Sequence, residues 1–111
     1  MKYMMLVCVD PSIEAVEVES VEPWVEETER RGIRVLGNEL RPLAEAVTVR
    51  VRGGDLLVSD GPFAETKEII AGFDILECAS LEEAVEVAAK HPLAKLGALE
   101  LRRFADEQYR Q

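Results

Sequence analysis

An almost unbroken apolar run near the N-terminus, Lys2–Val9 (KYMMLVCV), constrains more than any other feature what this chain can fold into. The run ends at Asp10-Pro11 and has the length of a β-strand. A continuous apolar strand needs cover on both faces of its sheet, whereas an alternating strand leaves one face in water. Any fold proposed for this chain must therefore place a covering layer against each face of that strand.

Two later segments have the periodicity of amphipathic helices and carry start and stop signals. A helix start is typically marked by a Ser whose side chain caps the first turn, and a helix end by Gly or by an X-Pro step. The signals are Ser20 and Gly32 for the first helix, and a Ser80–Glu83 capping box and His91-Pro92 for the second. Between Ser12 and Glu19 the sequence is compatible with either a loop or an earlier helical turn.

The remaining apolar stretches predict further strands, two of them joined by a hairpin turn at Gly53-Gly54. The element order becomes strand, helix, strand, hairpin, strand, helix, strand, which predicts an α+β fold of the ferredoxin-like split βαβ type with an added β-hairpin. Both helices would then cover one face of an antiparallel sheet. The expected strands are Ile33–Leu40, Val47–Arg52, Leu56–Val58, Gly72–Cys78 and Ala98–Phe104.

No third helix is predicted for the second sheet face. We therefore expect a homodimer that stacks these faces in a dimeric α/β-barrel-like assembly. A length of 111 residues suits one domain, spanning residues 1–111.

Composition excludes several classes of function. With 13 Lys and Arg against 22 Asp and Glu, the formal net charge is −9, which argues against a nucleic-acid partner because phosphate backbones are bound by clustered cations. No apolar run approaches the ~18 residues of a membrane-spanning helix, and no cleavage pattern follows the first strand. We expect a cytoplasmic protein that does not bind membranes.

Cofactor and metal motifs are also missing from the sequence. Cys8 and Cys78 each lie inside a strand-like run, without a CxxC pair or a second histidine, so we expect two reduced thiols and no metal site. Neither a phosphate-binding GxxxxGK[ST] loop nor a GxGxxG turn occurs, so no nucleotide cofactor is predicted.

The most distinctive segment runs from Ser59 to Glu68 (SDGPFAETKE). Gly61 gives the backbone freedom and Pro62 fixes the next φ, which predicts a rigid corner at the end of a strand. In a structural interpretation, Asp60 accepts N–H groups of the turn and Phe63 fills the core. In a functional one, Asp60 is a general base or ligand anchor, and Lys67 holds an anionic group or lowers the pKa of Asp60. The further candidate ligand-binding residues of this segment are Gly61, Pro62, Phe63, Glu65 and Thr66.

Through this segment the chain resembles the DGPF-type branch of the YCII-related proteins, and the resemblance covers nearly the whole chain. It implies a dimeric ferredoxin-like domain, a biochemical role that is mostly unassigned, and for some relatives a link to sigma factors. It also implies, for the wider family, a His–Asp pair with an early histidine, whereas no histidine here precedes His91. The matching stretches are Asp60-Gly61-Pro62-Phe63 with Ala64-Glu65-Thr66-Lys67-Glu68, Val49-Arg50-Val51-Arg52, Gly72-Phe73, Ala88-Ala89-Lys90-His91-Pro92 and Glu100-Leu101-Arg102.

Three residues outside the motif complete the candidate site. His91 titrates near neutral pH and is, beside Asp60, the second candidate catalytic residue, although its position at a helix end favours a cation stabilised by the helix dipole. Arg50 and Arg102 alternate with apolar strand residues and should share a sheet face if their strands pair. There they could bind a small anionic metabolite or pair with carboxylates such as Asp74.

Two functions remain open on this sequence. The first is a non-catalytic dimeric module that binds a small ligand or a protein partner, in a regulatory, sigma-factor-linked setting. The second is a cofactor-independent lyase or isomerase that uses Asp60 as general base and Lys67 or Arg50 as anion clamp. We favour the first, because one histidine and two core-like cysteines do not supply a nucleophile, a base and an orienting group.

Overall fold

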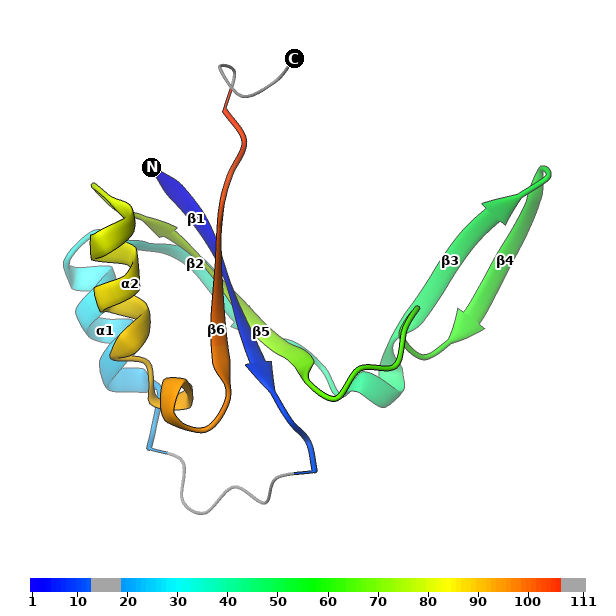
Figure 1. Cartoon of the computed structure of the whole chain (residues 1–111), viewed down its shortest axis with the longest axis horizontal. Helices are drawn as coiled ribbons and strands as arrows, with labels where there is room; N and C mark the ends of the chain where they lie inside the picture. Colours follow the sequence, from blue (N-terminus) through cyan, green and yellow to red (C-terminus); the bar gives the residue numbers. More distant parts are fainter. Residues whose placement is uncertain (13–18, 107–111) are drawn as a thin grey trace.

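A computed structural model describes residues 1–12 and 19–106 of the chain, so most of the segment between Ser12 and Glu19 lies outside the described residues. The elements follow the predicted order (Figure 1). They are β1 (Lys2–Val9), α1 (Glu22–Arg30), β2 (Arg34–Glu39), η1 (Leu43–Glu45), β3 (Val47–Arg52), β4 (Asp55–Asp60), β5 (Ile69–Glu77), α2 (Leu81–Ala89), η2 (Pro92–Lys95) and β6 (Ala98–Arg103), where η marks a short 3-10 helix.

Four strands form one antiparallel sheet in the order β2-β5-β1-β6. The central position of β1 agrees with its continuous apolar sequence, and the α+β, ferredoxin-like arrangement is confirmed. The strand β5 begins at Ile69, three residues before the predicted start at Gly72. Because β1 and β5 are antiparallel, Cys8 lies opposite Ile70 while Cys78 follows the other end of β5, and both thiols are free.

The two faces of the sheet are covered differently. Alternate side chains of β1 and β5 are buried beneath the helices: Tyr3, Met5 and Val7 from β1 and Leu76 from β5. The intervening residues face the other way, and no described element covers them. We call this surface the open face; by the strand register it comprises Met4, Leu6, Cys8, Leu36, Asn38, Ile70, Phe73, Ile75, Glu100 and Arg102.

The helix α2 begins and ends where the sequence signals indicated. The predicted Ser20 cap of α1 is wrong by one residue, because Val21 is the N-cap and Ser20 Oγ instead accepts the Glu22 N–H at 3.3 Å. Ser80 accepts the Glu83 N–H while the Glu83 carboxylate accepts the Ala79 N–H, so the predicted capping box is confirmed. Gly32 follows α1 with φ of 70°, a backbone conformation that glycine adopts without strain. The helices are joined by a buried hydrogen bond of 2.9 Å from Trp24 Nε1 to the Val87 carbonyl.

The hairpin β3–β4 forms a sheet of its own and projects away from the four-stranded sheet (Figure 1). We call its residues, Val47–Asp60, the arm. Gly53 and Gly54 make its turn with φ of 57° and 83°, as the predicted hairpin requires. The arm explains why the radius of gyration is 16.3 Å, when a compact chain of this length would have about 13 Å.

Candidate functional site

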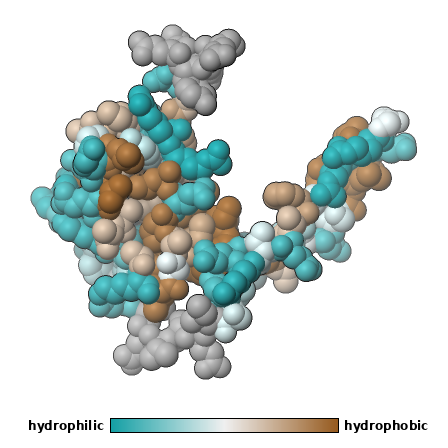
Figure 2. Space-filling model, in the orientation of Figure 1, coloured by the Kyte–Doolittle hydropathy of each residue, from teal (hydrophilic) through white to brown (hydrophobic). Residues whose placement is uncertain are grey.

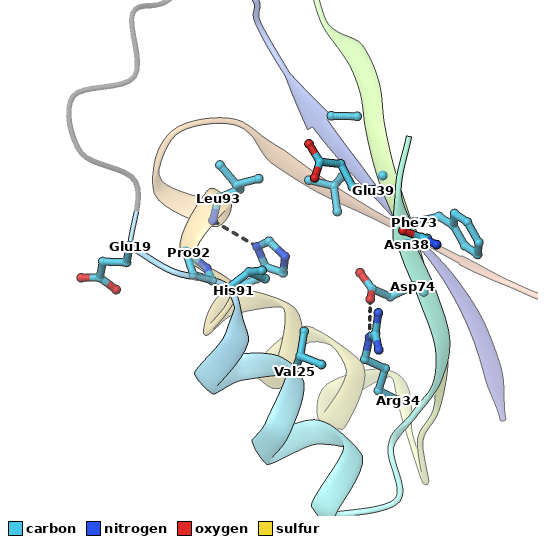
Figure 3. Close-up of a pocket in the computed structure, with 15 residues that line it drawn as sticks. Glu19, Val25, Arg34, Asn38, Glu39, Phe73, Asp74, His91, Pro92 and Leu93 are labelled. Atoms are coloured by element: carbon cyan, nitrogen blue, oxygen red, sulfur yellow. Dashed lines mark hydrogen bonds and ion pairs between the residues drawn. The ribbon is translucent and has the colours of Figure 1, made fainter. Parts of the chain in front are cut away.

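The candidate site is a cavity of about 400 Å³ on the helix side of the sheet. Its walls come from the adjacent strands β2 and β5, from the start of α1 and from the turn His91–Leu93 (Figure 3). The volume lies within the range of about 300–1,000 Å³ that is typical of small-molecule pockets. Most of the wall is apolar, with Val7, Val21, Val25 and Leu93 among its residues, and the polar groups are few.

His91 contributes the central polar group and is only 4% exposed. Pro92 starts η2 after α2 has ended at Ala89, and His91 caps η2 by accepting the Leu93 N–H on Nδ1 at 3.1 Å. Its ring stands edge-on to Trp24, with ring centroids 4.8 Å apart. Burial lowers the pKa of His91, against a smaller opposing influence of the Asp74 charge. The prediction of a helix-end cation is therefore wrong, because the turn carries the ring out of water.

The hydrogen bond to Nδ1 also decides which nitrogen of His91 carries the proton. A neutral imidazole has one donor and one acceptor, so a ring that accepts on Nδ1 donates from Nε2. Nε2 makes no hydrogen bond to any described residue. Because every fully buried polar side-chain atom of the described residues has a hydrogen-bond partner, Nε2 is not fully buried. The Nε2–H group is therefore accessible from the cavity, as a hydrogen-bond donor for whatever binds there.

Asp74 and Arg34 form the second polar pair of the wall. Arg34 Nε lies 2.7 Å from Asp74 Oδ1, and Arg34 Nη1 lies 2.7 Å from Glu29 Oε1. The side chains of Arg34 and Asp74 are 14% and 8% exposed, and the two carboxylates raise the pKa of Arg34 against the effect of its burial. Gly37 makes room for this pair, because a Cβ atom there would overlap the Asp74 carboxylate and the Arg34 guanidinium.

Carboxylates dominate the charge of the cavity wall. Glu19, Glu39 and Asp74 stand against Arg34 alone, since His91 is neutral. The Glu39 carboxylate makes no hydrogen bond or ion pair within the described residues, so it can accept a proton or a hydrogen bond from a ligand. An excess of acceptors favours an uncharged ligand with hydroxyl groups over the anionic metabolite expected from the sequence.

The structure places the DGPF segment away from this cavity, at the base of the arm. Gly61 has φ of 92°, and its N–H donates to the Ala46 carbonyl at 2.7 Å. Its carbonyl accepts the Thr48 hydroxyl at 2.8 Å, so the corner is anchored to β3. Asp60 is exposed, and Phe63 is 79% exposed. The structural interpretation in which Phe63 fills the core is therefore wrong for the single chain.

The other candidate residues lie on several surfaces. Lys67 Nζ is 3.9 Å from Asp10 Oδ2, so Asp10 rather than Asp60 is its partner. Arg50 is on the arm, where it donates to the Phe63 carbonyl at 3.5 Å, and Arg102 is on the open face of the main sheet. Their strands do not pair, so the two arginines share no sheet face. Pro62, Glu65 and Thr66 are exposed in the same segment, where the Thr66 hydroxyl donates to the Glu68 carbonyl.

Of the predicted candidates only His91 lines the cavity, and the sequence reasoning missed Arg34, Glu39 and Asp74. A signal for Asp74 was available: it stands inside an apolar strand, and charged residues are seldom buried without a partner. Nothing local indicated Arg34 as that partner, since 40 residues separate the two.

Comparisons with known proteins agree with the architecture. Residues 1–107 match the family model of the YCII-related domain. A protein of Rhizobium meliloti (strain 1021), described as uncharacterised, is 51% identical over 49 residues, which make up 44% of this chain and 40% of that protein. The match therefore spans less than half of that relative.

No described helix is long and apolar enough to cross a membrane.

A solved structure shares the fold along the whole chain. It is the 5-chloro-2-hydroxyhydroquinone dehydrochlorinase of Burkholderia phenoliruptrix AC1100 in complex with 2,5-dihydroxybenzoquinone. The similarity covers 100% of both chains with a TM-score of 0.56 and 15% sequence identity. At this level of identity the likeness concerns the fold.

Proposed function

The chain belongs to the YCII-related domain family, and we propose that it is a cofactor-independent lyase or isomerase that moves a proton on a small hydroxylated molecule. The observation that carries the proposal is the buried, neutral His91, whose Nε2–H group opens into the cavity. The solved structure with a similar fold acts on a hydroxylated ring, 5-chloro-2-hydroxyhydroquinone, a class of ligand that suits an acceptor-rich apolar cavity.

The geometry favours a division of roles between donor and acceptor. Because Nδ1 accepts the Leu93 N–H, His91 acts as a neutral hydrogen-bond donor that stabilises negative charge developing on a ligand oxygen. Glu39, which has no partner within the described residues, takes the proton from carbon. Asp74 orients the site through its ion pair with Arg34 and is a positioning residue. In this proposal Glu39 replaces Asp60 as the base.

The test measures how fast carbon-bound hydrogen of an uncharged probe is replaced by deuterium from the solvent. The probe is hydroxyhydroquinone, dissolved in D₂O and kept free of oxygen. We expect the protein to accelerate deuterium incorporation into the ring, and Glu39→Gln to reduce that rate by about 10²-fold or more while the probe still binds. Binding is followed by the fluorescence of Trp24, the only tryptophan and a neighbour of His91. Arg41→Gln, at an exposed residue outside the cavity, is the control.

The second candidate function is a non-catalytic module that binds a small ligand, including the sigma-factor-linked setting that the resemblance implied. The mostly apolar cavity wall favours it, because such walls bind well without reacting. Saturable quenching of Trp24 without any deuterium incorporation would decide for this alternative. Absence of both signals would count against both functions for this class of ligand.

The working unit that we propose is a cytoplasmic homodimer. Its support is the open face, where Leu36 and Ile70 are 56% and 48% exposed although both are aliphatic. An apolar sheet face without a covering layer is normally buried against another layer. Stacking against a second copy supplies that layer.

A further inference from the structure

One side of the arm is apolar except for Asp60 at its base, and no described element covers it. The β3–β4 register places five aliphatic side chains on one side of the hairpin: Val47, Val49, Val51, Leu56 and Val58. Each is between 58% and 68% exposed. Folded monomers rarely expose a contiguous apolar patch larger than a few hundred Å², and patches of that kind mark interaction surfaces. The opposite side of the arm carries Thr48, Arg50, Arg52, Asp55, Leu57 and Ser59.

The same chain offers a second surface that no described element covers, the open face, which is mostly apolar. Figure 2 shows hydrophobic colour both on the arm and over the middle of the body. A six-residue strand is about 20 Å long, whereas four strands span about 14 Å between the first and the last, so one arm can cross the whole sheet. Because the arm points away from its own sheet, the two surfaces cannot meet within one chain (Figure 1).

Charge favours a second copy over an unrelated acidic or basic partner. The chain carries a net charge of −9, but in the arm Arg50 and Arg52 balance Asp55 and Asp60. A neutral, apolar arm can approach another highly acidic chain without strong repulsion, and Arg50 and Arg52, on the opposite side of the arm, stay in water when the apolar side docks. Two such contacts related by a two-fold axis bury both arms and both open faces, which closes the assembly.

We propose that the apolar face of each arm docks across the open face of a second copy in a reciprocal, arm-exchanged dimer. This specifies the covering layer of the proposed homodimer: the partner's arm takes the place of a stacked sheet, which would leave the five aliphatic side chains of the arm in water. The exchange also carries the DGPF corner, with its exposed Phe63, to the boundary between the two chains. The proposal does not depend on what the cavity binds.

The test compares two neighbouring residues on opposite sides of one strand. Leu56→Lys places a charge on the apolar face of the arm, and Leu57→Lys places the same charge on the polar side. By sedimentation equilibrium we expect Leu56→Lys to raise the dimer dissociation constant at least about tenfold and Leu57→Lys to change it less than about threefold. Equal effects of the two variants, or a monomeric wild-type chain, would overturn the proposal.

A cross-linking experiment on the otherwise wild-type chain locates the contact and does not depend on how the lysine variants fold. A photo-reactive phenylalanine analogue replaces Leu56, and the labelled protein is equilibrated with a large excess of an isotopically heavy copy without the analogue, so that nearly every labelled chain pairs with a heavy one. We expect cross-links only between light and heavy chains, to peptides of β1, β5 or β6. Cross-links within one chain, or to the helices of the second copy, contradict the arm-exchanged arrangement. Deuterium exchange into hydroxyhydroquinone reports on the cavity separately, so failure of one proposal can be told from failure of the other.

Discussion

At the scale of single residues, His91 shows how a turn can reverse the role that a sequence position indicates. The residue lies two positions after the last residue of α2 and by position would be a dipole-stabilised cation. Pro92 instead starts η2, and the ring turns inward against Trp24, where burial lowers its pKa. The same turn fixes the tautomer through the Leu93 N–H. Pro92 therefore turns His91 from an expected charge at a helix end into a buried neutral ring that donates from Nε2.

This lowered pKa predicts how the stability of the fold depends on pH. In the unfolded chain His91 titrates near its ordinary pKa of about 6.5, so below that pH the unfolded state binds the proton more readily than the folded state. The free energy of unfolding should fall as the pH drops from about 7.5 to about 5.5, by at most about 1.4 kcal/mol per pH unit.

Urea unfolding at the two pH values measures this effect. His91→Asn is the matched variant, because Asn keeps an acceptor for the Leu93 N–H but does not titrate. We expect the variant to be less stable at both pH values and to lose the pH dependence. An equally steep pH dependence in His91→Asn would show that other groups cause it.

Gly37 supplies a second prediction at the residue scale. In Gly37→Ala the new methyl group would meet the Asp74 carboxylate, the Arg34 guanidinium and the Phe73 carbonyl, and the carbonyl is backbone that cannot turn aside. We expect a loss of about 1–3 kcal/mol in the free energy of unfolding, together with weaker probe binding. Leu36→Ala, at the preceding residue of β2 but on the open face and outside the cavity wall, is the control and should leave probe binding unchanged.

At the scale of elements, the local signals determined most of the fold. Ser80 with Glu83, Gly32 and Gly53-Gly54 each mark a boundary through backbone chemistry that acts within a few residues, and the structure has these boundaries. The surface against which the hairpin packs could not be predicted from these signals. Alternation shows that Val47, Val49 and Val51 share an apolar side, but it does not say what that side packs against. The cavity escaped prediction for the same reason, since Arg34 and Asp74 meet only through the pairing of β2 with β5.

The corner that ends the arm is predicted to depend on Gly61. Gly61→Ala forces a side chain into φ of 92°, which costs about 1–2 kcal/mol, and weakens the anchoring to Ala46 and Thr48. We expect faster hydrogen exchange of the residue 61 amide and no change at the β1–β5 pairs. Ser59→Ala is the control in the neighbouring strand. Unchanged protection of that amide in Gly61→Ala would mean that the corner is held by other contacts.

At the scale of the whole molecule, the chain is a helix-covered sheet with an acidic exterior and a neutral apolar arm. An arm-exchanged dimer is more stable at higher protein concentration, because unfolding separates the two copies. We expect the Tm of the wild-type chain to rise by several degrees over a hundredfold increase in concentration, and the Tm of Leu56→Lys to stay constant. A wild-type Tm that does not depend on concentration would argue for a monomer.

The proposed function depends most on a neutral His91 that offers its Nε2–H group to a ligand, and ¹⁵N NMR of the imidazole ring measures that protonation state directly. The chain has one histidine, so both ring nitrogen signals are assigned without ambiguity. We predict the signals of a neutral ring protonated on Nε2 at pH 7, still neutral below the ordinary pKa of about 6.5, with a shift of the Nε2 signal when hydroxyhydroquinone is added. A ring protonated on Nδ1, or a charged ring at pH 7, would contradict the account.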